Sequence, residues 1–218
     1  MIGTRIGIGV YTLQEASLYS CVSPQRLSRW VFGARNCSPV IKSLLASDRL
    51  LSFYDLVQAK AIDVARKEGI SLQKIRQAIE VAQDEYSVEF PLARQHKLLY
   101  YDGELHIKLN GIFQVSGRRR HQMLSNEIVE PFAKDLHFDE EGLAFMWTPF
   151  SRFRRCIVLD PKRQFGQPLV DGTGYTADVL STSFKAEGSH EAAAEAYNVE
   201  VDDIKIAVAY IKGLMEAA

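Results

Sequence analysis

The chain has 218 residues, 47% of them hydrophobic and 24% charged, a composition typical of a folded globular protein with a buried core. Its formal net charge of -1 argues against a protein that binds nucleic acid over its whole surface. The charge is unevenly distributed. Residues 1–50 carry six basic and two acidic side chains, a net +4, whereas residues 171–218 carry three basic and nine acidic ones, a net -6. The two ends are therefore expected to meet different partners, or to attract each other as solvated faces.

The cysteines and histidines suggest neither a disulfide nor a metal site. The chain has three cysteines, Cys21, Cys37 and Cys156, which are far apart in sequence. An odd number of widely separated cysteines is typical of a protein in a reducing cytoplasm. No histidine is spaced with a cysteine or carboxylate as metal ligands usually are, so we expect no metal and no cofactor. The sequence shows no charged-then-apolar pattern typical of a leader and no apolar run long enough to span a bilayer, so we expect a cytoplasmic protein without a membrane partner.

The stretch from Tyr11 to Gly33 predicts two short helices joined by a tight turn. Thr12 followed by Glu15 forms a capping box, which marks the start of the first helix. Ser23 followed by Pro24 marks the start of the second, because proline is well tolerated in the first helical turn. This is the layout of a helix-turn-helix, which reads DNA in many proteins and also occurs in helical domains that bind no nucleic acid.

The second of these helices is expected to have a buried face and a polar face. Leu27, Trp30 and Val31 follow helical spacing and should point inward. The outward positions hold Gln25, Arg26, Ser28 and Arg29. Arginine and glutamine at such positions are the side chains that contact phosphates and base edges.

A connector and two longer helices follow. Residues 33–48 are expected to form a connector between helices. Within it, Val40–Leu45 is expected to form a short β segment of the kind called a wing. Helical spacing of apolar residues predicts a helix over Leu51–Glu68 and another from Ser71 to about Gln83. Ser52 and Asp55 resemble a capping box at the start of the first, with Asp in place of the usual Glu. The polar face of the second, which includes Arg76, is expected to be solvated.

The middle of the chain predicts β hairpins. Asp102-Gly103, between Leu98–Tyr101 and Glu104–Leu109, is a strong signal for a two-residue turn, and Asn110-Gly111 is a second such turn. The arginines that follow either contact phosphates or are simply solvated; they are Arg118, Arg119 and Arg120. Beyond them we expect a helix over Gln122–Leu136.

Towards the end the chain alternates between strands and helices. A further hairpin is predicted from Leu136–Phe138 and Leu143–Trp147, and a buried strand from Cys156–Leu159. Three helices follow, the first over Thr176–Glu187, the second capped by Ser189 and the last capped by Asp202. Carboxylates at the start of the last helix would repel DNA, so this second helix-turn-helix layout suits a packed core or a protein interface.

Two stretches resemble a known family. Y-T-x-x-E-A followed by R-L-S-R-W-V-x-G resembles the MerR-like helix-turn-helix at the start of certain bacterial antitoxins. G-Q-P-L-V-D-G-T-G-Y-T-A-D-V-L, together with residues 189–210, resembles a small trihelical domain of unknown function. That domain is known from VapB-type antitoxins whose partner toxins are PIN-like nucleases. The family usually has Gly-Thr-Arg where this chain has Gly172-Thr173-Gly174, so a contact made by that arginine is not expected here.

We therefore expect a mainly α fold with a small antiparallel β region. The expected parts are a MerR-like helix-turn-helix domain over residues 1–90, a central α+β region over 91–160 and a trihelical interaction domain over 161–218. The resemblance implies an antitoxin that neutralises a PIN-like ribonuclease toxin and represses its own operon, as a homodimer, by binding operator double-stranded DNA. The expected DNA-binding residues are Thr12, Ser23, Gln25, Arg26, Ser28, Arg29 and Arg35.

Two other functions compete with this one. A MerR-like regulator that senses a small ligand would have no toxin partner. Its pocket would lie among aromatic residues of the β region, although core packing is the more common role of such residues. An enzyme is not expected, and we identify no catalytic residue. The acidic pairs Glu140-Glu141 and Asp202-Asp203 are adjacent in sequence, so their side chains point in different directions.

Overall fold

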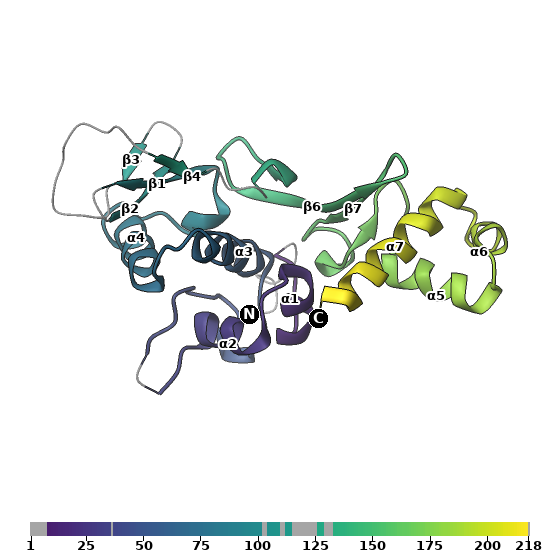
Figure 1. The fold of residues 1–218 in the computed structure, drawn as a ribbon, viewed down its shortest axis with the longest axis horizontal. Helices are drawn as coiled ribbons and strands as arrows, with labels where there is room; N and C mark the ends of the chain where they lie inside the picture. Colours follow the sequence, from purple (N-terminus) through teal and green to yellow (C-terminus); the bar gives the residue numbers. More distant parts are fainter. Residues whose placement is uncertain are drawn as a thin grey trace. The chain divides into compact units, whose positions relative to one another are not determined.

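The computed structural model describes residues 8–35, 37–101, 104–109, 112–114, 126–128 and 133–217, and this part of the chain is mainly helical with a small amount of antiparallel β structure (Figure 1). The predicted fold class is therefore confirmed. The chain forms two compact units. The N-terminal unit is Thr12–Ala144, and the C-terminal unit is Phe145–Ala218 together with the segment up to Tyr11. The division into three parts at residues 90 and 160 stays a prediction.

The N-terminal unit begins with helices whose ends follow the predicted signals. They are α1 (Leu13–Ser20), α2 (Pro24–Phe32), α3 (Phe53–Lys67) and α4 (Leu72–Asp84). Both predicted capping boxes are present: the hydroxyl of Thr12 accepts the Glu15 N–H at 3.2 Å, and that of Ser52 accepts the Asp55 N–H at 3.2 Å. Cys21, in the left-handed conformation with φ of 55°, ends α1 and makes the tight turn into α2.

The loop after α2 differs from the prediction. No strand forms over Val40–Leu45; instead the N–H groups of Val40 and Ile41 both donate to the carbonyl of Trp30, at 2.8 and 2.9 Å. The backbone donors that a wing strand would need are thus used to close the end of α2. Ala34 and Cys37 form an isolated antiparallel bridge in this loop. A short 3-10 helix, Ala46–Asp48, precedes α3.

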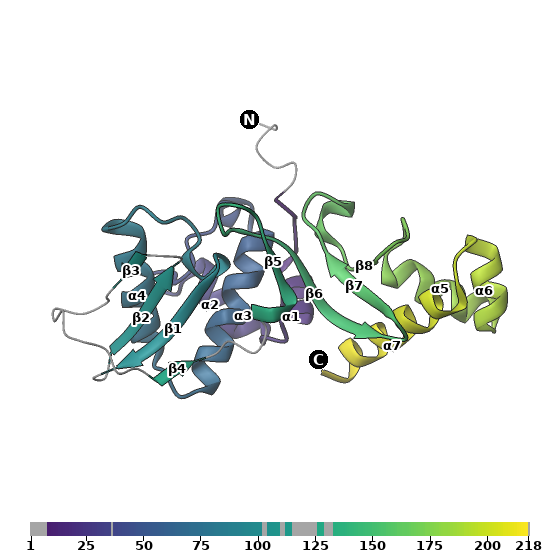
Figure 2. The same cartoon turned by 90° about the horizontal axis from the view of Figure 1, so that it is seen from above.

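An antiparallel sheet of order β3-β2-β1-β4 packs against α4 through β2 (Figures 1 and 2). Its strands are β1 (His96–Tyr101), β2 (Glu104–Leu109), β3 (Ile112–Gln114) and β4 (Asn126–Ile128). Tyr101 pairs with Glu104, so the predicted two-residue hairpin is confirmed, although its turn residues lie outside the described part of the chain. A short 3-10 helix, Pro91–Ala93, precedes these strands in the sequence, and another, Ala133–Asp135, follows them. Strand β5 (Leu136–Phe138) comes directly after the second.

The helix predicted over Gln122–Leu136 is wrong where the structure describes it. Asn126–Ile128 is strand β4, which pairs with β1 in antiparallel register, Leu99 opposite Glu127. The open edge of β1 offers hydrogen bonds that satisfy this backbone, and such tertiary pairing overrides a weak local preference for helix.

The C-terminal unit packs α7 along β7 and against α5 (Figure 2). Its elements are β6 (Ala144–Arg152), β7 (Arg155–Leu159), β8 (Leu169–Val170), α5 (Ala177–Glu187), α6 (His190–Tyr197), α7 (Val201–Ala217) and the 3-10 helix Gln164–Gly166. Ser189 caps α6 as predicted, and Thr176, predicted as the first residue of the preceding helix, is the N-cap of α5. At α7 the predicted cap is wrong: the helix begins at Val201, so Asp202 lies within its first turn, and the carboxylate of Asp203 accepts the N–H of Glu200, the residue before the helix, at 3.0 Å.

The segment ending at Tyr11 is tied to the C-terminal unit by hydrogen bonds. The N–H of Val10 donates to the carbonyl of Phe165 at 3.0 Å, and the hydroxyl of Tyr11 donates to the carbonyl of Gly166 at 2.8 Å. Tyr11 is fully buried, so this contact forms part of the core of the unit. Among the described residues, no helix is long and apolar enough to cross a membrane.

Candidate nucleic-acid interface

Helix α2 has the two faces that its sequence predicts. Leu27, Trp30 and Val31 are buried, with at most 5% of each side chain exposed. Three of the predicted DNA-binding residues on this helix are exposed: Gln25, Arg26 and Arg29. A fourth, Ser28, is half-buried. The buried apolar face fixes the rotation of α2, and this rotation leaves the polar residues accessible to a partner.

The start of α2 is open to solvent. Ser23 occupies the N-cap position, but its hydroxyl makes no capping hydrogen bond, and Pro24 begins the helix. The first N–H groups of a helix have no partner within it and carry a partial positive charge. The exposed Ser23 hydroxyl and these groups therefore offer donors of the kind that bind phosphate.

The polar face of α2 forms one wall of a hollow of about 620 Å³, which we call the basic hollow. The loop after α2, the end of α3 and the start of α4 form the other walls. Its charged lining residues are Arg26, Arg29, Arg66, Lys67, Arg76 and a single acid, Asp63. Five cations against one carboxylate make this hollow suited to a polyanion.

Three of these cations are held by other groups of the unit. Arg76 donates to the carbonyl of Pro39 at 2.9 Å and to the hydroxyl of Ser38 at 3.2 Å. Arg66 donates to the carbonyl of Ile70 at 2.8 Å. Lys67 pairs with the buried carboxylate of Asp63 at 2.7 Å. Their side chains are therefore fixed in position before any partner binds, which lowers the entropy cost of binding.

The two arginines of α2 differ from these. Within the described part of the chain, neither Arg26 nor Arg29 forms a hydrogen bond or an ion pair. Both guanidinium groups are exposed, so their donors remain free to bind phosphate oxygens or base edges.

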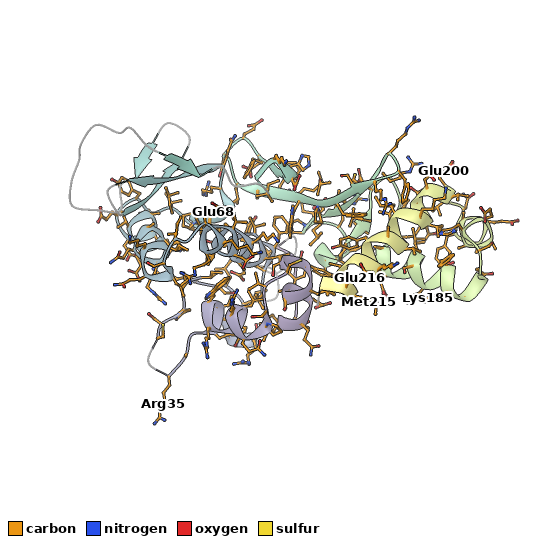
Figure 3. All side chains as sticks on the ribbon, viewed as in Figure 1. Arg35, Glu68, Lys185, Glu200, Met215 and Glu216 are labelled. Atoms are coloured by element: carbon orange, nitrogen blue, oxygen red, sulfur yellow. The ribbon has the colours of Figure 1, made fainter. Side chains whose placement is uncertain are left out.

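The other predicted DNA-binding residues have different surroundings. Arg35 is exposed at the Ala34–Cys37 bridge, and Figure 3 shows it pointing outward from the loop after α2. The hydroxyl of Thr12 is engaged in the capping box and also donates to the Glu15 carboxylate at 2.8 Å. Arg118, Arg119 and Arg120 lie outside the described residues. DNA contact by each of these residues stays a prediction.

The sequence does not identify Arg66, Lys67 and Arg76 as site residues. Arg76 was expected only to be solvated, and no local signal distinguishes it from other polar residues on α4. These three side chains meet α2 only because α3 and α4 fold back beside it. Arg66 and Lys67 lie in the last turn of α3. Basic residues at this end of a helix commonly interact with the negative end of the helix dipole, so the sequence gives no reason to assign them to a site.

A second, smaller hollow of about 560 Å³ lies in the C-terminal unit, between the turn before α5 and the turn before α7. Arg155 and the nearly buried Asp203 form an ion pair of 2.7 Å in its wall. A hydrogen bond from Lys205 at 2.9 Å lowers the pKa of the neighbouring Asp202. Gly174 also lines the hollow, and a Cβ atom placed there would meet no other atom within 4 Å. Its backbone therefore does not require glycine.

Among the described residues, no group of three or more histidine, cysteine, aspartate or glutamate side chains is arranged to hold a metal ion. The three cysteines are all free thiols in the structure, and Cys21 and Cys37 are exposed. Burial raises the pKa of the third, Cys156, and the nearby carboxylate of Asp171 raises it further.

Part of the C-terminal unit is similar to a known family. A family described as a protein of unknown function, DUF433, matches residues 157–211, which span β7 to α7. This match covers α5, α6 and most of α7, the part of the chain that resembles a trihelical domain of unknown function.

Two matches from Mycobacterium tuberculosis, one to a curated protein and one to a solved structure, extend over almost the whole chain. One, named "Putative antitoxin VapB45", is 28% identical over 231 aligned residues, which cover 94% of each protein. The other is the crystal structure of Rv2018, which matches with a TM-score of 0.65 at 22% identity and covers 94% of this chain and 99% of that one. The second likeness shows that the two chains share a fold.

Proposed function

We propose that this protein is the antitoxin of a toxin-antitoxin system, and that it binds operator DNA through the basic hollow and the exposed face of α2. The observation that carries the DNA-binding part is the pair of free, exposed arginines, Arg26 and Arg29, beside three fixed cations. The antitoxin part is supported by the similarity to "Putative antitoxin VapB45" over 94% of the chain.

In this proposal α2 enters the major groove and the basic hollow receives a sugar–phosphate strand. Arg26 and Arg29 lie on both features, because they belong to α2 and also line the hollow. Gln25 and Ser28 are placed to reach base edges, while the start of α2 at Ser23 and the loop at Arg35 are placed to reach phosphates.

A homodimer would place two copies of α2 on the two halves of a palindromic operator. Helix-turn-helix dimers bind half-sites about one turn of DNA apart, which matches the symmetry of the protein to that of the site. We therefore propose that the operator is a palindrome and that the DNA-binding form is dimeric.

The second partner is a toxin of the PIN-like ribonuclease class, as the resemblance of the helix-turn-helix and trihelical stretches implies. We propose that the C-terminal unit contacts it. Residues 171–218 carry a net charge of -6, which disfavours DNA and leaves this region for a protein partner.

One experiment in cells tests both activities and separates them. A reporter carries the DNA upstream of the chain's own gene, and the adjacent gene is expressed as the toxin. We expect the unaltered chain to repress the reporter and to restore growth. We expect the Arg26→Ala/Arg29→Ala variant to lose repression and still to restore growth, because the substitutions lie in the N-terminal unit on exposed side chains.

The matched control is Lys185→Ala/Lys212→Ala, which removes two positive charges from exposed positions of the C-terminal unit. It should repress like the unaltered chain. Repression that survives the arginine substitutions contradicts the DNA-binding surface. Repression without any growth protection by the unaltered chain contradicts the antitoxin role and favours a ligand-sensing regulator.

A further inference from the structure

The hairpin between β6 and β7 has an unusual turn. Arg152 pairs with Arg155, so Phe153 and Arg154 form a two-residue loop, and both have positive φ, 55° and 59°. Turns of this kind favour Asn-Gly or Gly-Gly, because the left-handed conformation crowds any larger side chain. Phenylalanine and arginine at these two positions destabilise the turn, and backbone strain of this type is concentrated at functional sites.

The tip of this hairpin presents an aromatic ring and positive charge to solvent. The side chain of Phe153 is 40% exposed, and the guanidinium of Arg152 lies 4.8 Å from the centre of its ring. Arg152 and Arg154 are both exposed, and neither forms an ion pair with a carboxylate in the part of the chain that the structure describes. We call residues 152–154 the hairpin tip.

The base of the hairpin is firmly anchored. Arg155, the first residue after the turn, pairs at 2.7 Å with the carboxylate of Asp203, which is only 6% exposed. The rest of β7 packs against α7, and Ile157, Val158 and Leu159 are buried. The hairpin tip therefore projects from a rigid support, which keeps the strained turn in place and holds its side chains ready for a partner.

We propose that the hairpin tip is a docking element for an acidic surface on a protein partner. Exposed aromatic and arginine side chains are the residues most enriched at the energetically dominant centres of protein interfaces. Phe153 would supply apolar contact, and Arg152 and Arg154 would pair with carboxylates of the partner. This inference rests on the proposed function, in which the toxin is the protein partner of the C-terminal unit.

The surroundings of the hairpin tip favour a protein over a nucleic acid. Asp202 and Asp203 in the first turn of α7, and Glu200 just before it, lie close to the hairpin. The pKa of Asp202 is lowered by its hydrogen bond to Lys205 and also by the charges of Arg155 and Arg154, which places the Arg154 charge near this carboxylate. A nucleic-acid backbone lying against the tip would meet these carboxylates, whereas a compact acidic patch can contact the tip alone.

The test replaces the turn by its favoured sequence. Phe153→Asn/Arg154→Gly relieves the strain, so we expect its Tm to rise by roughly 3 to 6 °C. The same variant should bind the protein encoded by the adjacent gene at least tenfold more weakly than the unaltered chain does. A gain in stability together with a loss of binding cannot be caused by misfolding. Arg154→Glu, which reverses one charge, should also weaken binding at least tenfold.

The control is Lys185→Glu, which makes the same change of charge on the exposed α5 position labelled in Figure 3. Its affinity for the partner should stay within twofold. Affinity for DNA from upstream of the gene should also stay within twofold for both tip variants. Partner binding unchanged in both tip variants overturns the docking role alone, and a loss of DNA binding shared by both shows that the tip contacts nucleic acid instead. Absence of partner binding by the unaltered chain overturns the proposed function and the docking role together.

Discussion

The guanidinium of Arg76 on α4 donates a hydrogen bond of 2.9 Å to the carbonyl oxygen of Pro39, 37 residues earlier in the chain. Further contacts of the same group reach the hydroxyl of Ser38 at 3.2 Å and the thiol of Cys37 at 3.4 Å. One side chain thus contacts three consecutive residues, 37–39, of the loop that carries Arg35. Because Arg76 also lines the basic hollow, it contributes charge to the proposed DNA surface and fixes its geometry.

We expect the two contributions of Arg76 to separate in two substitutions. Arg76→Ala removes both the charge and the loop contacts, and should lower the affinity for operator DNA about tenfold, in line with the roughly 1–3 kcal/mol of a good arginine contact. Arg76→Lys keeps the charge but loses the planar fork that reaches several acceptors at once. An affinity for Arg76→Lys equal to that of the unaltered chain, measured by gel shift at fixed salt, would contradict the positioning role.

Gly166 should be essential for the stability of the C-terminal unit. Its φ is 85°, and a Cβ atom there would lie against the hydroxyl of the buried Tyr11, which donates to the Gly166 carbonyl. We expect Gly166→Ala to lower the free energy of unfolding by about 2–4 kcal/mol, measured by urea denaturation. The control is Gly172→Ala, where φ is 80° but a Cβ meets nothing within 4 Å. It should cost only about 1 kcal/mol, the conformational part. Equal losses in the two variants would show that the Tyr11 contact has no effect.

Asp55 should make the stability of the N-terminal unit depend on pH. One carboxylate oxygen accepts hydrogen bonds from Ser43 and Ser52, while the other is buried and has no partner among the described residues. Burial raises the pKa of Asp55, against the hydrogen bonds, which lower it. The folded chain therefore holds the proton more tightly than the unfolded chain, whose value is about 3.9.

The stabilisation from this proton is complete below about pH 3.9 and is lost as the pH rises through the raised folded-state pKa. Relative to Asp55→Asn, which does not titrate, the unaltered chain should lose stability as the pH rises from about 4 and then level off. Urea denaturation of both proteins from about pH 3.5 to 7.5 measures this difference. If the unaltered chain instead gains stability relative to Asp55→Asn as the pH rises, the hydrogen bonds to Asp55 outweigh its burial.

The position at which the family's arginine is missing should accept one. Gly174 has no left-handed φ, and no atom lies within 4 Å of a Cβ placed there. We expect Gly174→Arg to fold with a Tm within roughly 2 °C of the unaltered chain, as for most exposed substitutions. A large fall in Tm, measured by calorimetry, would show that the hollow beside Gly174 cannot hold a long side chain.

The features predicted from sequence are those set by neighbouring residues. The capping boxes at Thr12 and Ser52 and the hairpin that joins β1 to β2 each depend on a few consecutive side chains, and each is present. Features set by distant residues were missed. Strand β4 forms because β1 offers it an edge, and Tyr11 is buried because it contacts Gly166. No local pattern records either contact.

The candidate site divides in the same way. The exposed face of α2 follows from helical spacing, so Gln25, Arg26 and Arg29 could be predicted as accessible. The basic hollow required the fold, because Arg66 and Arg76 belong to other helices and face α2 only in three dimensions. Sequence thus identified the helix that we propose to read DNA, and the structure identified the charges around it.

The most direct test of the proposed DNA surface is the salt dependence of binding. The affinity for DNA from upstream of the chain's own gene is measured between about 50 and 200 mM salt for the unaltered chain and for Arg26→Ala/Arg29→Ala. Each lost phosphate contact should reduce the slope of log affinity against log salt by about 1. We predict a slope shallower by 1 to 2 for each bound copy and an affinity at least tenfold lower. The same slope and an affinity within twofold would contradict the assignment of this surface to DNA.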